Sequence, residues 1–305
     1  MINNEFNPKH IILSRKGFDS AAGGDASMIV DIGNGKKVIQ PLPIPDPYDT
    51  LGGTTYADIK SFVEGYDNLC RLMKDAEIIP MIKGHNPPIN ICHKDPDLFA
   101  KTKKGAFGQM GTAEAHLRRN KVGEGDLFLF FGWYKSYKLE GEKLIRQRGD
   151  ECDDKHVLYG YLYVDKEYDL ANKDRFDAVP KDYCNHPHYR KQKIDKTISN
   201  NRLYVAKEFI PGTSIPGYGV FKYKKDLVLS KEDAPKSMWK IDDGGFMSML
   251  GKDREMTYHK NIDKCWQKDY FQSVARGQEF IINSSGDENK EFRDYIYQFI
   301  LDHAK

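Results

Sequence analysis

His93, Asp95 and Asp97 stand at alternate positions of the sequence HKDPD and bring one imidazole and two carboxylates into a short segment. Imidazole and carboxylate groups bind divalent cations, and the same two groups also serve as a general base with an orienting acid. The sequence Asp-Pro-Asp is equally typical of turns and helix caps, which do no chemistry. The spacing alone therefore leaves a metal site, an acid–base pair and a structural turn open.

A second group of polar residues follows the short apolar segment 10–13. Arg15, Lys16, Asp19 and Ser20 precede the sequence AAGG. Glycines let backbone N–H groups approach a ligand and the two cations supply charge, so this loop is a candidate anion site. It does not match a P-loop, which requires Gly-Lys-Ser/Thr at a fixed spacing. An ordinary solvated turn is the alternative interpretation.

Two further polar residues are candidates because of their local structure. Asp46 lies in the sequence PLPIPDP, whose prolines stiffen the chain and would hold its carboxylate in a fixed place. His116 lies on a helix predicted over 112–120. A lone histidine on a helix is more often a core or cap residue than a catalytic one.

Cys184, His186 and His188 form a cluster of residue types that zinc binds, with Cys152 and His156 elsewhere in the chain. The cluster lacks the Cys-x-x-Cys spacing that makes a zinc prediction specific. We therefore predict no structural zinc there, and we assign no residue as a metal ligand. The cofactor is left open, with a divalent cation as one candidate.

The chain has 305 residues, 39% of them hydrophobic and 30% charged, which is typical of a globular protein and excludes a disordered one. No run approaches the ~18 apolar residues of a membrane span, and the first residues lack a signal-peptide pattern. Five widely spaced cysteines favour reduced thiols over a disulfide framework. We expect a cytoplasmic protein with no membrane partner.

The segment 190–240 has an excess of Lys and Arg, interleaved with aromatic residues such as Tyr204, Phe209 and Phe221. This pattern suits a nucleic-acid backbone with bases stacked on aromatic rings, which makes a nucleotide or DNA the candidate partner. A solvated basic face explains the same composition equally well.

The elements that must position these groups centre on the segment 127–134, which is almost entirely apolar after a Gly-Asp turn and predicts a strand buried on both faces. The segment 156–164 predicts its neighbour, with Gly160 relieving crowding. A closing amphipathic helix is expected over 287–303. Without regular βαβ alternation, the chain predicts an α+β fold with a mixed, curved sheet or partial barrel of about eight strands and flanking helices.

The motifs SRKGFDS, LPIPD, HKDPDL, FGQMG with HL downstream, GDLFLFFGWY and HVLYGYL occur in this order. Together they resemble the nucleotide modification associated domain 3 family of phages and bacteria, clearly over 11–164 and more thinly to 229. The resemblance implies an α+β domain linked to DNA base modification and phage–host conflict. We expect a family core over 1–230 and an extension over 231–305 that packs on the same core.

The motif positions and the residue types together support an enzyme, a transferase or hydrolase acting on a nucleotide or a base in DNA. The expected catalytic residues are His93, Asp95, Asp97, Asp19 and His116. The expected substrate-binding residues are Arg15, Lys16, Ser20, Asp46 and Gln109. The alternative is a non-catalytic reader that encloses a modified base in an aromatic pocket.

Two structural expectations follow from the enzyme hypothesis. The loop of Arg15, Lys16 and Asp19 should face the same cavity as His93 and Asp95. Truncating His93 or Asp95 should cost about 1 kcal/mol or less, since loop side chains contribute little packing.

Overall fold

The computed structural model describes residues 5–49, 52–86, 88–99, 104–147, 154–275 and 277–304. Its centre is a curled sheet of mixed strand direction, in which the described residues form ten hydrogen-bonded strands and part of a barrel. Across the sheet lie, in order, β14 (Glu279–Asn283), β1 (His10–Arg15), β7 (Leu127–Glu140), β9 (Lys155–Asp169), β10 (Asn201–Ala206) and β6 (Ala106–Met110).

The remaining strands attach to this sheet or form two small ribbons. Off the main path, the sheet carries β3 (Ser27–Asp31), β4 (Lys37–Gln40), β8 (Lys143–Arg146) and β11 (Tyr218–Val220). The ribbons pair β2 (Ala22–Gly23) with β5 (Met81–Ile82) and β12 (Met238–Lys240) with β13 (Tyr270–Gln272). The predicted α+β class with a mixed, curved sheet is confirmed.

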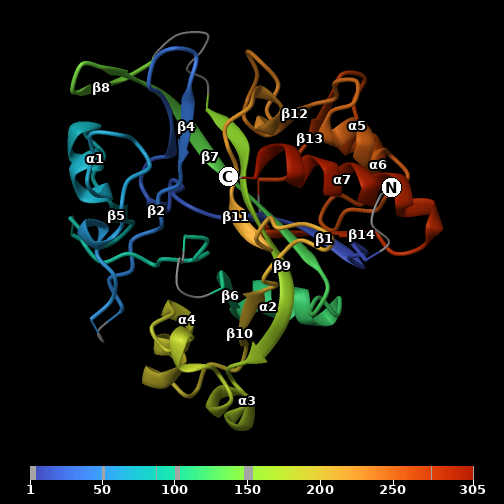
Figure 1. Ribbon diagram of the computed structural model, residues 1–305, viewed down its shortest axis with the longest axis horizontal. Coiled ribbons are helices and arrows are strands. Elements are labelled where there is room, and N and C mark those ends of the chain that lie inside the picture. The colour runs from blue at the N-terminus through green and yellow to red at the C-terminus, as the bar shows by residue number, and fades with distance from the viewer. Residues whose placement is uncertain are drawn as a thin grey trace.

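The helices surround the sheet. They are α1 (Leu69–Asp75), α2 (Gly111–Arg119), α3 (Lys173–Asp177), α4 (Pro187–Ile194), α5 (Phe246–Leu250), α6 (Ile262–Cys265) and α7 (Lys290–His303). In Figure 1, β7 and β9 run through the middle, with α1 on one side, α5, α6 and α7 on the other, and α3 and α4 below. None of the helices in the described residues has both the length and the apolar character needed to cross a membrane.

The strand pair β7 and β9 is the rigid centre of the molecule. The residues 127–131 of β7 are fully buried, as the apolar run predicts. Gly160 of β9 lies opposite Phe130, and a Cβ atom at Gly160 would stand 2.7 Å from the carbonyl oxygen of Gly219. The predicted role of Gly160 is confirmed, because only glycine permits this close approach of β11 to β9.

The short helix α1 begins where Asn68 accepts a hydrogen bond from the N–H of Arg71. The polar segment 166–200 contains α3 and α4. The structure corrects the expectation that aromatic residues of the segment 190–240 stack on bases. Tyr204 and Phe221 are buried in the core, so neither ring is available to stack on a base.

The residues after 230 join the same core. β14 pairs antiparallel with β1 along its whole length, and the apolar face of α7 packs into the main core cluster. The buried Trp239 donates a hydrogen bond from Nε1 to Nδ1 of His156 on β9, at 3.0 Å. These contacts tie the C-terminal residues to the central strands, while the division at residue 230 stays a prediction.

Phe130→Ala should severely destabilise the protein. The side chain is fully buried in β7, and its removal leaves a cavity that costs roughly 3–5 kcal/mol, a large part of a typical ~5–15 kcal/mol. Urea unfolding of the variant measures the loss. The matched control is Phe209→Ala, whose ring is 47% exposed and should cost about 1 kcal/mol or less. Equal losses would show that β7 is not the core of the fold.

A pH dependence follows from the buried His156. Burial lowers the pKa of His156 to about 3, from an unfolded value near 6.5. Below about pH 6.5 the unfolded chain binds a proton that the folded chain cannot. The stability contributed by neutral His156 is therefore complete above that pH and is lost as the pH falls toward 3.

We expect the free energy of unfolding of the wild type to fall on the order of a few kcal/mol more than that of His156→Gln between pH 6.5 and 3. The glutamine amide does not titrate and can still accept the hydrogen bond of Trp239. Urea unfolding at several pH values provides the comparison. Parallel curves for the two proteins would contradict a neutral His156 in the folded state.

Candidate functional site

A cavity of about 1790 Å³ lies where the ends of β1 and β6 meet the start of α2. Its walls also include parts of the segments 44–48 and 188–191, the whole segment 233–237, and the residue pairs 274–275 and 277–278. Eight of the predicted site residues line it: Arg15, Lys16, Asp19, Ser20, Asp46, His93, Asp95 and Gln109. The prediction that the two polar loops face one cavity is confirmed, while the chemical roles of these residues stay predictions.

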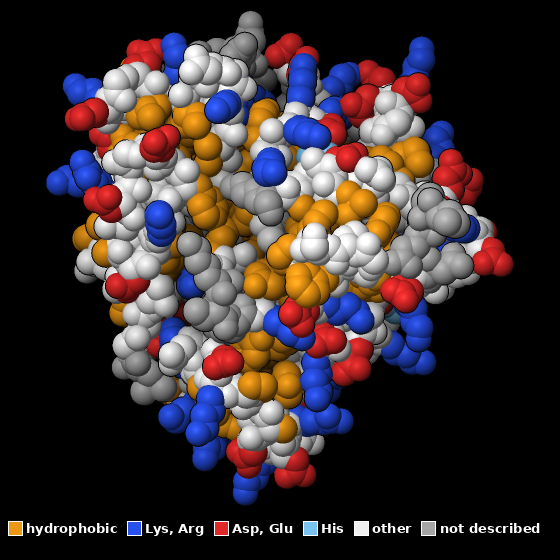
Figure 2. Space-filling model, viewed as in Figure 1, with side chains coloured by type: hydrophobic (Ala, Val, Ile, Leu, Met, Phe, Trp, Pro, Cys, Tyr) orange, Lys and Arg blue, Asp and Glu red, His pale blue; other side chains and the backbone are white. Residues whose placement is uncertain are grey.

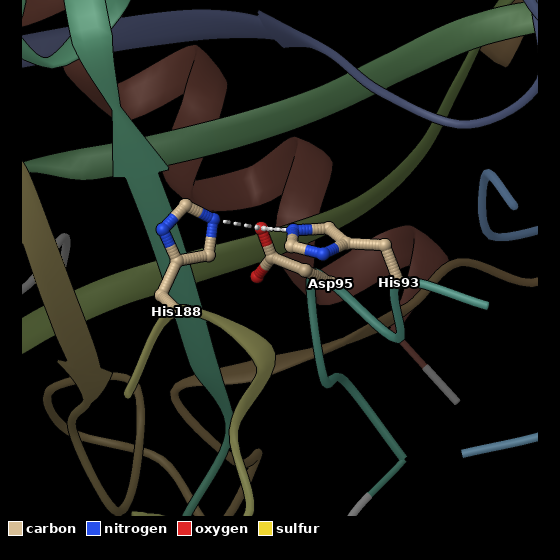
Figure 3. Close-up of side chains that lie close together, drawn as sticks. All are labelled: His93, Asp95 and His188. Carbon is tan, nitrogen blue, oxygen red and sulfur yellow. Dashed lines mark ion pairs between the residues drawn. The ribbon is translucent and has the colours of Figure 1, made fainter. Parts of the chain in front are cut away.

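Inside this cavity, His93 and Asp95 lie next to His188, which comes from α4. Nε2 of His93 is 3.8 Å from Oδ2 of Asp95, and Nε2 of His188 is 3.5 Å from the same oxygen. The two imidazole rings are 5.0 Å apart between centroids. Figure 3 shows both rings pointing toward the carboxylate from opposite sides.

The other oxygen of Asp95 is held by two different groups. The backbone N–H of Gly108 donates to Oδ1 at 2.9 Å, and Nε2 of His186 lies 3.2 Å from it. Gly108 also lets α4 approach β6, because a Cβ atom there would stand 2.2 Å from the ring of His188. Gly108 of the FGQMG motif is therefore required by the close approach of His188, while its backbone N–H holds the carboxylate.

Asp46 orients His93 from the side opposite Asp95. Its Oδ2 accepts a hydrogen bond from Nδ1 of His93 at 3.1 Å and lies 2.9 Å from Nζ of Lys191. Burial opposes the ionisation of Asp46, but these two partners outweigh it and hold the pKa of Asp46 well below its usual range. Burial lowers the pKa of His93 to about 4. His93 is therefore neutral near pH 7, with Nε2 facing Asp95.

The cationic loop is connected to the C-terminal strand β14. Arg15 donates hydrogen bonds to the carbonyl oxygens of Val274 and Ala275 at 2.9 and 2.8 Å. Nζ of Lys16 lies 2.8 Å from the buried carboxyl of Glu279, which also accepts from Gln109. Both cations thus have protein partners, although Nε of Arg15 makes no hydrogen bond within the described residues.

Two predicted catalytic residues do not line the cavity. Asp97 pairs with Lys94 at 3.2 Å and forms backbone hydrogen bonds with Ala106. His116 lies on α2, where Nε2 contacts the hydroxyl of Thr257 at 3.2 Å. Asp19 lines the cavity, but its carboxylate already accepts the N–H groups of Ala21 and Ala22, so it shapes the loop.

The most important residues that the sequence patterns do not assign to the site are His186, His188 and Lys191. In the sequence, the two histidines stand beside Cys184 in a cluster without zinc spacing, and Lys191 lies in a basic stretch. Within the described residues, the group that geometry allows to hold a metal is His93, Asp95 and His188, without Cys184. Cys152 lies outside the described residues. Pro187 directly after His186 is a helix-start signal that could have placed both histidines at one helix end.

The model of one protein family, described as nucleotide modification associated domain 3, matches residues 10–283 of the chain. The match includes every segment named above as lining the cavity and continues through β14. No curated protein and no solved structure matches the chain.

Asp95→Ala should destabilise the protein more than the loop position of Asp95 led us to expect. Its side chain is 3% exposed, and its removal leaves the N–H of Gly108 without an acceptor and the ring of His186 without its neighbouring carboxylate. Leaving buried donors unpaired costs about 1–3 kcal/mol. Urea unfolding in the presence of a chelator measures the effect without bound cations. The exposed Glu124→Ala serves as control and should change stability by less than about 0.5 kcal/mol; an equally small effect for Asp95→Ala would refute the packing argument.

Proposed function

We propose that this chain, which belongs to the nucleotide modification associated domain 3 family, is an enzyme that acts on a nucleotide or on a modified base in DNA. One observation carries the proposal: cationic side chains and a buried histidine–aspartate cluster line the same large cavity. The family description supports the nucleotide setting, and the resemblance to phage and bacterial proteins supports a role in DNA modification or phage–host conflict.

The size and the lining of the cavity support a nucleotide ligand. Typical small-molecule pockets have about 300–1,000 Å³. The cavity is larger, at about 1790 Å³, so a nucleotide with part of its flanking backbone would fit. Lys191 and Lys236 line it together with Arg15 and Lys16, and α2 begins at its wall. Helix N-termini and lysine or arginine side chains are the groups that bind phosphates.

The outer surface supports binding of a DNA duplex less than the cavity supports binding of a nucleotide. On the face shown in Figure 2, the Lys and Arg side chains are interspersed with Asp and Glu, and hydrophobic side chains gather along the middle. Binding to the phosphates of a duplex favours a contiguous basic surface. A ligand held inside the cavity therefore agrees better with this face than a duplex lying across it.

The buried cluster supplies the groups that would react. His93 is held by Asp46, and Asp95 is held by Gly108, so both side chains are fixed before a ligand arrives. Fixed, buried polar groups are what acid–base catalysis and cation-assisted catalysis require. A protein that only binds a base has no need for such a cluster.

The alternative, a reader without catalysis, needs aromatic faces that can stack on a base. The ring of Trp133 lines the cavity, but the ammonium groups of Lys135 and Lys236 lie 4.7 and 4.3 Å from its centroid. Tyr48 and Tyr258, which are 64% and 46% exposed, are the lining aromatics that remain accessible for stacking. A reader would stack a base on these two exposed rings. Exposed rings support the reader hypothesis less than an enclosed aromatic pocket would.

The proposal is tested by first identifying the ligand and then measuring whether the protein converts that ligand to a product. Mass spectrometry of small molecules that co-purify with the protein defines candidates, which are incubated with it alongside single-stranded DNA that contains modified bases. We expect His93→Gln to lower turnover by about 100-fold or more while ligand binding changes little. Lys191→Gln should weaken binding about 10-fold.

The matched control is Lys252→Gln, an exposed lysine away from the cavity, which should leave both binding and turnover unchanged. Binding without any turnover, lost on Tyr258→Ala and kept in His93→Gln, would establish the reader instead. A protein that binds no nucleotide or DNA at all would refute both functions.

A further inference from the structure

We propose that His93, Asp95 and His188 bind one divalent transition-metal ion. Within the described residues, one ligand atom of each side chain lies within 4.8 Å of those of the other two. His93 and Asp95 come from the loop before β6, whereas His188 comes from α4, nearly a hundred residues later. All three line the cavity and have nearly buried side chains, so a shared function explains their convergence.

The hydrogen bonds fix which nitrogen of each ring carries the proton. Nδ1 of His93 faces the carboxylate of Asp46 at 3.1 Å and must donate. Nδ1 of His188 faces Oδ1 of Asn201 at 2.8 Å. That amide is oriented because its nitrogen donates to the carbonyl oxygen of His188. In the neutral form, each ring therefore presents an unprotonated Nε2 to Asp95.

Oδ2 of Asp95 completes the set, since it lies 3.8 and 3.5 Å from the Nε2 atoms of His93 and His188. Oδ1 of Asp95 accepts from Gly108 and lies against His186, whose Nδ1 accepts from the backbone and leaves Nε2 protonated. Its Oδ2 faces only the two unprotonated Nε2 atoms of His93 and His188 among these rings. Three lone pairs thus point into one buried space, where a cation would relieve their repulsion.

The distances fit a metal ion better than direct hydrogen bonds. The separations of 3.8 and 3.5 Å from Asp95 Oδ2 to the two Nε2 atoms exceed a normal N–H···O distance of about 2.7–3.2 Å. Ligands about 2.1 Å from a metal at a tetrahedral angle stand about 3.4 Å apart. The observed spacing needs only small shifts to place an ion at bonding distance from all three atoms.

The surroundings have the features of a metal site. Each histidine donates its other ring N–H to an oxygen, of Asp46 or of Asn201, as metal-bound histidines commonly do. Two imidazoles with one carboxylate favour ions such as Fe²⁺, Mn²⁺, Co²⁺ or Zn²⁺ over Mg²⁺ and Ca²⁺, which prefer oxygen ligands. Three protein ligands leave coordination positions open on the side of the cavity.

Metal binding stands independently of the nucleotide assignment, whereas the use of the ion rests on the proposed function. An ion at this place would polarise a group of the ligand or activate a water molecule. The binding experiment therefore contains no nucleotide. Its failure would leave the proposed enzyme with acid–base chemistry, and the absence of a nucleotide ligand would leave the metal site intact.

The test is a titration of chelator-treated, dialysed protein with Co²⁺. Calorimetry and the visible absorption of the bound ion monitor the titration. We expect one Co²⁺ per chain, competition by Zn²⁺, and no competition by an equal concentration of Mg²⁺. His188→Ala and Asp95→Asn should each weaken binding at least 100-fold. Asp46→Asn, which acts through His93, should weaken it about 10–100-fold.

Two controls separate this site from other histidines and cysteines. His116→Gln, outside the cavity, and Cys184→Ser should bind Co²⁺ like the wild type, with unchanged circular dichroism as the check on folding. The proposal is overturned if the folded wild type binds no stoichiometric Co²⁺ or Zn²⁺. It is equally overturned if binding survives His188→Ala or is lost with Cys184→Ser.

Discussion

The arrangement of the site depends on burying the Asp95 carboxylate. A buried carboxylate is tolerated only when partners replace the water that it loses. These partners come from β6, through the N–H of Gly108, and from the start of α4, through His186. One side chain therefore joins a loop, an edge strand and a helix end, and these three segments form one wall of the cavity.

The buried carboxyl of Glu279 does the same for the cationic loop. It accepts hydrogen bonds from Ser14, Lys16 and Gln109, which lie at the ends of β1 and β6. Because Glu279 begins β14, the cationic loop near the N-terminus cannot be positioned without the C-terminal strand. This dependence gives a physical reason why the family match continues to residue 283, well beyond the clear sequence resemblance.

Local patterns predicted the parts of this structure that local physics decides. The apolar run of β7 and the close approach at Gly160 both follow from residue types and their spacing. The position of His188, the partner of His93 and Asp95, does not follow from such local patterns. His188 is placed by the packing of α4 on Gly108, a tertiary contact that no periodicity encodes. Asp97 shows the converse, since its spacing suggested chemistry but its carboxylate pairs with Lys94.

The charges of the cavity connect the two proposals. Within the described residues, four basic and five acidic side chains line it. The basic ones are Arg15, Lys16, Lys191 and Lys236, and the acidic ones are Asp19, Asp46, Asp95, Asp154 and Asp233. Lys16 and Lys191 are moreover already paired with carboxyl groups, so the cavity by itself offers little net attraction for a phosphate. A divalent ion between His93, Asp95 and His188 would reverse that balance. A nucleotide-binding cavity with this lining would thus gain its positive charge most directly from a bound metal, so phosphate binding would depend on the ion, whereas metal binding does not depend on a nucleotide.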